Sequence, residues 1–361
     1  MMNEDEGGST KKQQRERKKL QRMLDEYRSK AADVRDNILE TRPANAWLAG
    51  ARNKRDARLL CGSLWREGEL AIMFADTGVG KSIFAVQLGE AIARGRGIGP
   101  LATEVPRSRV IYLDFELTEQ QFLMRYSGGT GGADKRRRYR FSKNFMRSQM
   151  VWDGEVPAAF RNAGELLSWS IIETLREAEA RVVIVDNISY LGSSNESANA
   201  ALSLMKGLKS IKAELGISIL VLAHTPKRAF SRLLSVNDMQ GSKMLANFAD
   251  SVFAIGTGGL DHSLRYIKQI KVRSGVLDYG ENNVVVFRLD KVGAFPRFTF
   301  IDERAESSFR TDGRSRSPEI ARKLLTAEAK RLAKEEKLSE REIARRLGLS
   351  NATVHRYLTS E

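Results

Sequence analysis

The sequence is poor in cysteine and lacks a long apolar segment. One of its 361 residues is a cysteine, Cys61, which excludes an internal disulfide and a cysteine metal cluster and favours a reducing compartment. No apolar run approaches the roughly 18 residues of a membrane-spanning helix. The N-terminal residues MMNEDEGGSTKKQQRERKK contain no apolar stretch of the kind that secretory signals carry. We therefore expect a cytoplasmic protein without a membrane partner.

Positive charge is concentrated toward both ends of the chain. The net charge is +15 at pH 7, with 42% hydrophobic residues, which is enough for a substantial core. Residues 1–58 hold 15 Lys and Arg against 10 Asp and Glu, and residues 304–361 hold 14 against 9. Both short ends are therefore more basic per residue than the middle. This pattern favours a polyanion partner, most simply nucleic acid, although a merely soluble basic surface is an alternative.

The central motif is FADTGVGKS, residues 74–82, which follows an apolar run typical of a buried strand and precedes a helical pattern. A strand, a glycine loop and a helix form a P-loop, in which backbone N–H groups surround the phosphates. Lys81 would reach the outer phosphates and Ser82 would hold Mg²⁺. Ala75 replaces the usual first glycine, so we expect an altered entry turn and a permissive backbone at Gly78 and Gly80. The expected ATP-binding residues are Ala75, Asp76, Thr77, Gly78, Val79, Gly80, Lys81 and Ser82.

Three further apolar runs end in a polar residue. Glu116 follows the apolar run in residues 108–116, Asp186 ends RVVIVD, and His224 ends GISILVLAH. Ligands bind at the carboxyl ends of the strands in open α/β sheets. We therefore expect Glu116 to polarise an attacking water. Asp186 would hold Mg²⁺ in a Walker B arrangement, and His224 would sense the γ-phosphate. Taken alone, Glu116 could instead cap the next helix, and His224 could be an ordinary surface histidine.

Basic residues also gather in loops and at one strand end. The loop of residues 127–140 could contact nucleic acid or could be a solvated insertion. The loop after His224 is expected to contact single-stranded nucleic acid through Lys227, Arg228, Arg232 and Lys243. Lys271 and Arg273 lie one residue apart at a strand end and so share a face. They form either a solvated edge or a pair that reaches a phosphate.

The order of these motifs resembles the RecA/DnaB branch of P-loop ATPases, and in particular the RepA-like hexameric ATPases of plasmids and mobile elements. The matching positions are 75–82, Glu116, Asp186, His224 and Lys271-x-Arg273-x-Gly275. The resemblance spans about residues 55–303. It implies that Glu116 activates water and that Lys271 and Arg273 act on the ATP of an adjacent subunit. A homo-oligomeric ring, hexameric by analogy, is therefore expected.

Two features of this family's relatives are missing. The sequence has no cysteine cluster like that of RadA-type relatives, and residues 1–50 are too short for the large helical N-domain of DnaB. The primase-binding and strand-loading roles of a bacterial replicative helicase are therefore unsupported.

The C-terminal segment LSEREIARRLGLSNATVHRYL, residues 338–358, matches a helix-turn-helix. Ser339 and Glu342 predict a capping box, Gly348 a turn, and Ser350 the cap of the second helix. The expected small core is Ile343, Ala344, Leu347, Leu349 and Val354. The expected contacts with duplex DNA are Asn351, Thr353, His355 and Arg356. A module that contacts protein instead is the alternative.

The sequence thus predicts an α/β fold: a RecA-like P-loop core with a mainly parallel sheet flanked by helices, an N-terminal helical arm and a small all-α C-terminal domain. The predicted domains are residues 1–54 (a disordered and helical arm), 55–303 (ATPase), 304–318 (linker) and 319–361 (helix-turn-helix). The arm would pack on a neighbouring subunit or on its own core. Trp47 and Trp65 are expected to be anchors before the P-loop strand.

The expected function is a DNA-dependent oligomeric ATPase that uses ATP and Mg²⁺, such as a helicase or replication protein of a plasmid or mobile element. The alternative is a regulatory or recombination ATPase that forms rings or filaments without unwinding. A small-molecule phosphotransferase is a third class. The pair Lys271 and Arg273 and the basic ends argue against it.

Overall fold

The computed structural model describes residues 15, 18, 19, 21–23, 25, 40–52, 55–128, 138–151, 154–187, 197–225, 233–239, 242–258, 261, 263–309 and 318–359. Most of the predicted arm helix and the loop cations Lys227, Arg228 and Arg232 lie outside these residues, as does the side chain of Lys243. The chain divides into two units, Met1–Asp56 and Ala57–Glu361. The smaller unit contains helix α2 (Ala44–Arg52), none of whose residues is buried. Trp47 is 47% exposed, so its prediction as an anchor was wrong.

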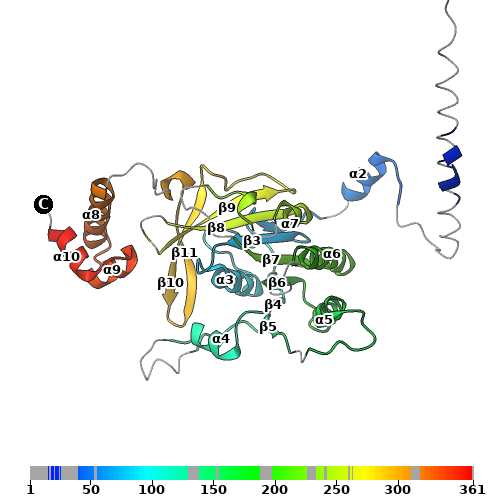
Figure 1. The fold of residues 1–361 in the computed structure, drawn as a ribbon, viewed down its shortest axis with the longest axis horizontal. Coiled ribbons are helices and arrows are strands. Elements are labelled where there is room, and N and C mark those ends of the chain that lie inside the picture. The colour runs from blue at the N-terminus through cyan, green and yellow to red at the C-terminus, as the bar shows by residue number, and fades with distance from the viewer. Residues whose placement is uncertain are drawn as a thin grey trace, which may run out of the picture. The chain divides into compact units, whose positions relative to one another are not determined.

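The larger unit is built around a nine-stranded sheet with the order β11-β10-β9-β8-β3-β7-β6-β4-β5 (Figure 1). The strands are β3 (Leu70–Ala75), β4 (Val110–Asp114), β5 (Phe145–Gln149), β6 (Val182–Asp186), β7 (Ser218–His224), β8 (Ser251–Thr257), β9 (Leu264–Val272), β10 (Val284–Val292) and β11 (Phe295–Arg304). The pairs from β8 to β5 are parallel. Strands β9, β10 and β11 add antiparallel pairs. The predicted mainly parallel α/β fold is confirmed.

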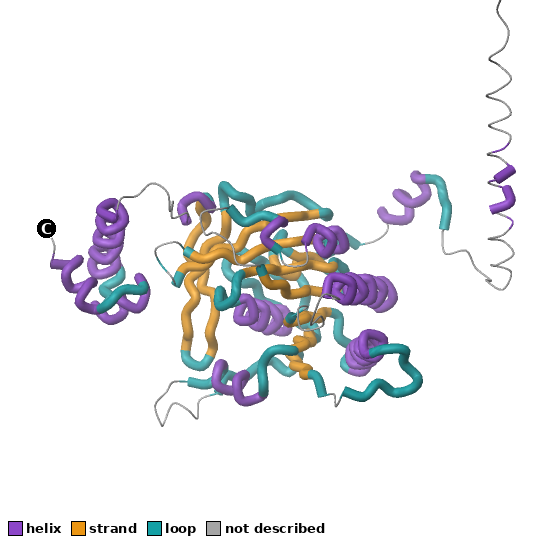
Figure 2. Tube along the Cα trace, in the orientation of Figure 1, coloured by secondary structure: helices purple, strands orange, loops and turns teal. Residues whose placement is uncertain are grey.

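Both faces of the parallel sheet are covered because the buried strand residues alternate between two apolar clusters. One cluster joins Met73 and Tyr112 to helix α3 (Lys81–Arg94). The other joins Ile72 to helices α5 (Ala163–Glu177), α6 (Ser197–Leu215) and α7 (Ser242–Phe248). Figure 2 shows these helices around the strands. The predicted anchor Trp65, from the short ribbon β1 (Leu59–Cys61) and β2 (Trp65–Arg66), is fully buried in the first cluster.

Two shorter helical regions complete the chain. Helix α4 (Glu119–Arg125) follows β4 and begins with a capping box from Thr118. After β11 come the 3-10 turn η4 (Glu306–Phe309) and helices α8 (Pro318–Glu335), α9 (Glu340–Leu347) and α10 (Asn351–Thr359). The last three helices enclose their own apolar cluster, as the helix-turn-helix prediction requires. Within the part of the chain that the structure describes, no helix is long and apolar enough to cross a membrane.

Candidate active site and DNA-binding module

The P-loop joins the end of β3 to the start of α3, as predicted. Gly78 and Gly80 adopt positive φ angles of 77° and 105°, so the two glycines supply the backbone that the missing first glycine could not. A Cβ at Gly80 would lie 3.2 Å from Leu289 Cδ2 and 3.3 Å from the Phe298 ring. Strands β10 and β11 therefore support the loop from outside and leave no room for a side chain there. The altered entry at Ala75 is held by Thr225, whose N–H donates to the Ala75 carbonyl at 3.2 Å.

Lys81, His224 and Glu116 meet at the carboxyl ends of neighbouring parallel strands. Lys81 Nζ lies 3.0 Å from His224 Nδ1, and His224 Nε2 lies 3.3 Å from Glu116 Oε1. Because an ammonium group can only donate, this geometry puts the histidine proton on Nε2, from which it can be donated to Glu116. The hydrogen bond with His224 lowers the pKa of Glu116, and burial lowers the pKa of Lys81. A carboxylate kept ionised at this point has the charge that a general base needs.

Asn187 is a fourth member of this group, and the sequence analysis missed it. It directly follows Asp186 and is 3% exposed. Its amide nitrogen donates to Glu116. The signal was its position one residue beyond a strand end that carries a functional aspartate.

Asp186 lies beside this group at the end of β6 and is 1% exposed. Burial raises its pKa to about 6, an effect that hydrogen bonds with Ser82 and Tyr112 oppose. The Tyr112 hydroxyl donates to one carboxylate oxygen, Oδ2. The other oxygen, Oδ1, is buried and has no hydrogen-bond partner among the described residues. A buried, unpaired carboxylate oxygen next to the P-loop hydroxyl fits a Mg²⁺ ion, which prefers oxygen ligands and substrate phosphates. When bound, Mg²⁺ supplies neutralisation of phosphate charge.

The segment that carries Glu116 is fixed by a buried ion pair. Asp114 Oδ1 accepts the N–H groups of Glu116 and Leu117 at 3.1 and 2.9 Å. Arg147 on β5 binds Asp114 Oδ2 at 2.8 Å and also donates to the Leu117 carbonyl. The Asp114 side chain has 0% exposure and that of Arg147 has 15%. These contacts hold the main chain beside Glu116. The sequence analysis did not assign this role to either residue.

Lys271 and Arg273 lie at the opposite edge of the sheet. Because β9 runs antiparallel, Val272 is opposite Ser251, the first residue of β8. Ser251 is level with Ala71 near the start of β3, whereas the P-loop begins at the other end of that strand. A separation on the order of 15 Å follows from about five residues of strand. The pair therefore cannot reach the nucleotide site of its own chain.

Both side chains contact one corner of their own chain. Lys271 Nζ donates to the carbonyls of Ala246 and Ala249 at 2.7 and 2.9 Å. Arg273 donates to the Asn247 carbonyl at 2.7 Å and pairs with Asp250 at 3.2 Å. The two cations thus share a face, as predicted. They also satisfy carbonyl groups at the C-terminal end of α7, where positive charge is favourable.

The C-terminal module has the predicted internal architecture. Ser339 and Glu342 form a capping box, and Gly348 ends α9 with a φ of 66°. Ser350 Oγ accepts the N–H of Thr353 at 3.2 Å. Four of the predicted core residues are at most 4% exposed, and Leu349 is packed against them.

The predicted DNA contacts lie on α10. Asn351, His355 and Arg356 are exposed, and Thr353 is half-buried. The Thr353 hydroxyl lies 2.8 Å from Ser350 Oγ, and His355 pairs with Glu340 at 2.9 Å. Val354 and Tyr357 are buried, so α10 presents a polar outer face. Contact of these residues with DNA stays a prediction.

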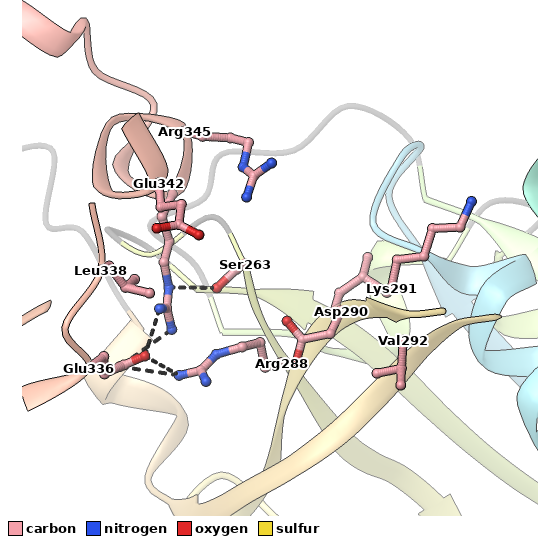
Figure 3. A pocket seen from close by; sticks show the side chains of 11 residues that line it. Ser263, Arg288, Asp290, Lys291, Val292, Glu336, Leu338, Glu342 and Arg345 are labelled. Carbon is pink, nitrogen blue, oxygen red and sulfur yellow. Dashed lines mark hydrogen bonds and ion pairs between the residues drawn. The ribbon is translucent and has the colours of Figure 1, made fainter. Parts of the chain in front are cut away.

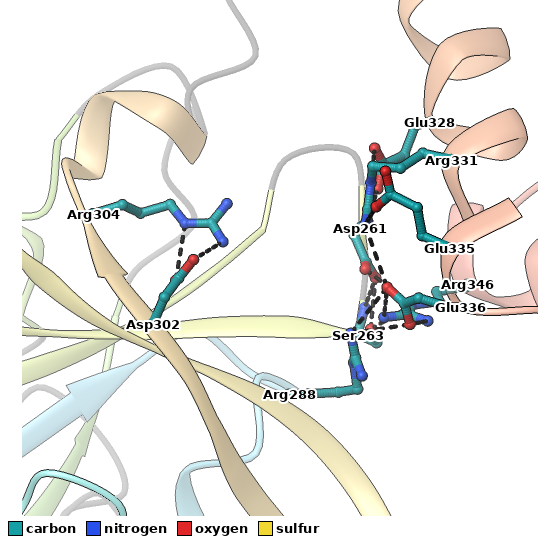
Figure 4. Close-up of polar contacts among 10 residues, drawn as sticks. All are labelled: Asp261, Ser263, Arg288, Asp302, Arg304, Glu328, Arg331, Glu335, Glu336 and Arg346. Carbon is teal, nitrogen blue, oxygen red and sulfur yellow. Dashed lines mark hydrogen bonds and ion pairs between the residues drawn. The ribbon is translucent and has the colours of Figure 1, made fainter.

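The module adjoins the turn between β8 and β9 through charged side chains. Arg346 Nε lies 3.0 Å from Asp261 Oδ2 and 3.1 Å from Ser263 Oγ, and Arg346 also pairs with Glu336 (Figure 4). Glu336 in turn binds Arg288 of β10 at 3.2 Å. Beside these contacts is a cavity of about 680 Å³ lined by charges of both signs, among them Asp290, Lys291 and Arg345 (Figure 3).

The fold and the carboxyl-edge site together define a P-loop ATPase with a RecA-like core. Residues 39–229, more than half of the chain, match the family described as an AAA domain, and the chain belongs to that family. Residues 331–360 match the IclR helix-turn-helix domain. The chain is therefore a nucleotide-binding ATPase that carries a helix-turn-helix.

Solved structures share the fold at low sequence identity. The ATPase domain of another protein is 13% identical, with a TM-score of 0.52, over 73% of this chain and 100% of that one. A KaiC-like protein from the hyperthermophilic archaeon Pyrococcus horikoshii OT3 is 13% identical, with a TM-score of 0.46, over 68% of this chain and 100% of that one. No curated protein matches the chain.

Proposed function

We propose that this ATPase is a DNA-dependent oligomeric machine, such as a helicase or replication protein of a plasmid or mobile element. The observation that carries the proposal is the polar, exposed face of α10 on the same chain as an ATPase core. The C-terminal module would recruit the protein to duplex DNA, and the basic core loops would contact single strands. The predicted domain boundaries, 55–303 and 319–361, divide these tasks between the two parts.

The chemistry proposed at the site uses residues that already lie together. Lys81 and the P-loop N–H groups bind the phosphates of ATP, while Ser82 and Asp186 hold Mg²⁺. Glu116 polarises the attacking water. His224 contacts both Lys81 and Glu116. A phosphate that draws Lys81 away from His224 would change the hydrogen bonding of Glu116 in the same step.

The assembly part of the proposal is supported by the position of Lys271 and Arg273 at the amino edge of the sheet. Cations there could complete a nucleotide site only on another protomer. A ring or filament would place the amino edge of one subunit near the carboxyl edge of the next. An arginine finger supplied in this way contributes on the order of 10³-fold or more to the rate.

A second candidate is a regulatory or recombination ATPase that assembles on DNA without unwinding it. The helix-turn-helix favours this class, because such modules read duplex DNA. Its basic residues would serve site recognition rather than translocation.

One experiment separates the two candidates. ATP turnover of the full chain is measured without DNA, with single strands and with duplex, and unwinding of a forked duplex is measured in parallel. Stimulation by single strands with unwinding supports the motor, and stimulation by duplex alone without unwinding supports the regulator. Turnover that is indifferent to DNA would contradict both. Lys81→Ala is the control that should lose turnover under all conditions, and Lys209→Ala, at an exposed lysine of α6, should lose none.

A further inference from the structure

A buried arginine outside every nucleotide motif contacts the P-loop backbone. Arg265, on β9, is 8% exposed. Its Nε donates to the Val79 carbonyl at 2.6 Å across 186 residues of sequence. Its Nη1 donates to the Leu264 carbonyl at 2.8 Å, which fixes the guanidinium from its own strand. Burying a charged side chain is costly unless its hydrogen bonds are satisfied, so a specific contact of this kind requires a reason.

Peptide geometry links this contact to phosphate binding. In a trans peptide, a carbonyl and the N–H that follows it point in opposite directions. The Val79–Gly80 peptide is trans, and its carbonyl points to Arg265. The N–H of Gly80 therefore points away from β9. Gly80 is the N-cap of α3, and the N–H groups at this position of a P-loop face the phosphates.

The charge on Arg265 adds to this effect. A cation on the carbonyl polarises the whole peptide unit and makes its N–H a better donor. Because Val79 is 4% exposed, water competes little for the carbonyl. The loop is thus held in one orientation before ATP arrives, and less ordering entropy is lost on binding.

We propose that Arg265 is a positioning residue for ATP binding, which holds the Val79–Gly80 peptide with its N–H toward the phosphates. This role depends on the ATPase assignment and not on DNA binding or assembly. It can therefore fail while the proposed function holds, and the reverse is also true.

The test compares Arg265→Met with Lys268→Met. Both residues lie on β9, and each is 8% exposed. Lys268 faces the other side of the sheet and pairs with buried Glu306 at 2.5 Å. Lys268→Met removes a buried charge partner and should lower the melting temperature, but it touches no P-loop atom. It controls for damage to the strand.

The readout is the affinity of the full chain for ADP with Mg²⁺, measured by calorimetry at a temperature where all variants are folded. Arg265→Met should weaken ADP binding by about tenfold, in line with the loss of a hydrogen bond to a charged group. Arg265→Lys keeps one cationic donor and should lose about threefold. Lys268→Met should bind ADP within about twofold of the parent chain, because additivity holds for independent sites.

Two outcomes would overturn the proposal. One is ADP binding by Arg265→Met within twofold of the parent chain. The other is an equal loss of affinity in Lys268→Met, which would make the effect one of general stability. If Arg265→Met does not fold, the same comparison is made with Arg265→Lys, for which unchanged ADP affinity contradicts the role.

Discussion

The two edges of the parallel sheet carry charge in different ways. At the carboxyl edge, Lys81, Glu116, Asp186 and His224 are brought within reach of one another by strand ends that adjoin in the sheet. At the amino edge, Lys271 and Arg273 bind main-chain carbonyls and Asp250 of their own chain. The carboxyl edge is a site prepared for a ligand, whereas the amino edge is a corner in which the cations already have partners. A function for the amino edge therefore requires that a neighbouring subunit offer something better.

The largest expected effect comes from Arg273. If it completes the site of a neighbouring protomer, Arg273→Ala should lower turnover on the order of 10³-fold and leave ATP binding within about twofold. Loss of the Asp250 pair alone should cost little, because the Arg273 side chain is 46% exposed. Turnover, ATP affinity and melting temperature measured on the same preparation distinguish the two roles.

Mixing variants tests whether the sites are shared. Glu116→Gln protein should also be inactive, but it keeps Arg273 intact. A mixture of Arg273→Ala with Glu116→Gln should regain turnover, since some interfaces then combine a normal Glu116 with a normal Arg273. Mixed rings that form and stay inactive would show that the amino edge only caps α7.

The next effect concerns how the carboxyl edge holds its aspartate. Tyr112→Phe removes the hydroxyl that donates to Asp186 and preserves ring packing against Phe145. The freed carboxylate should orient poorly, so half-saturation should need about tenfold more Mg²⁺, as is typical when a supporting hydrogen bond is lost. Binding of Mn²⁺ with ADP, followed by electron paramagnetic resonance, measures this without turnover.

Tyr126→Phe is the matched control. Tyr126 is also buried, at 3% exposure, and its hydroxyl has no hydrogen-bond partner among the described residues. Its loss should leave the metal dependence unchanged. Equal metal dependence of both variants would mean that Tyr112 serves packing alone.

Residues whose roles follow from local motifs were predictable from the sequence. The P-loop and the strand-end positions of Glu116, Asp186 and His224 required only an apolar run followed by a polar residue. Tyr112 was not predictable. It approaches Asp186 because β4 pairs with β6 and sets Asp114 level with Asp186, and strand order is not written in any local pattern.

Long-range partners were missed for the same reason. Arg147 and Arg265 reach main-chain atoms of segments 30 and 186 residues away. Their positions in sequence read as ordinary strand residues. The shared face of Lys271 and Arg273 followed from strand periodicity, but their contact with α7 depends on how that helix ends beside β8. The sequence thus predicted the groups that touch ATP better than the groups that hold them.

The smallest expected effect lies where the C-terminal module meets the carboxyl edge. Arg346 pairs with Asp261 in the turn that leads into β9, close in sequence to Arg265, which contacts the P-loop. Arg346→Ala should therefore weaken the link between DNA binding and turnover. It should lower stimulation of the ATPase by duplex DNA about fivefold, since a partly buried ion pair contributes about 1 kcal/mol. Basal turnover should not change.

The control for this variant is Arg331→Ala, which breaks ion pairs with Glu328 and Glu335 inside α8. It should leave stimulation nearly intact. The affinity of Arg346→Ala for duplex DNA should also be unchanged, because the side chain lies on α9 and not on the outer face of α10. An equal loss of DNA affinity and stimulation would place Arg346 at the DNA and contradict the link. Unchanged stimulation would mean that the module is a tether, and that the carboxyl edge receives no signal through this turn.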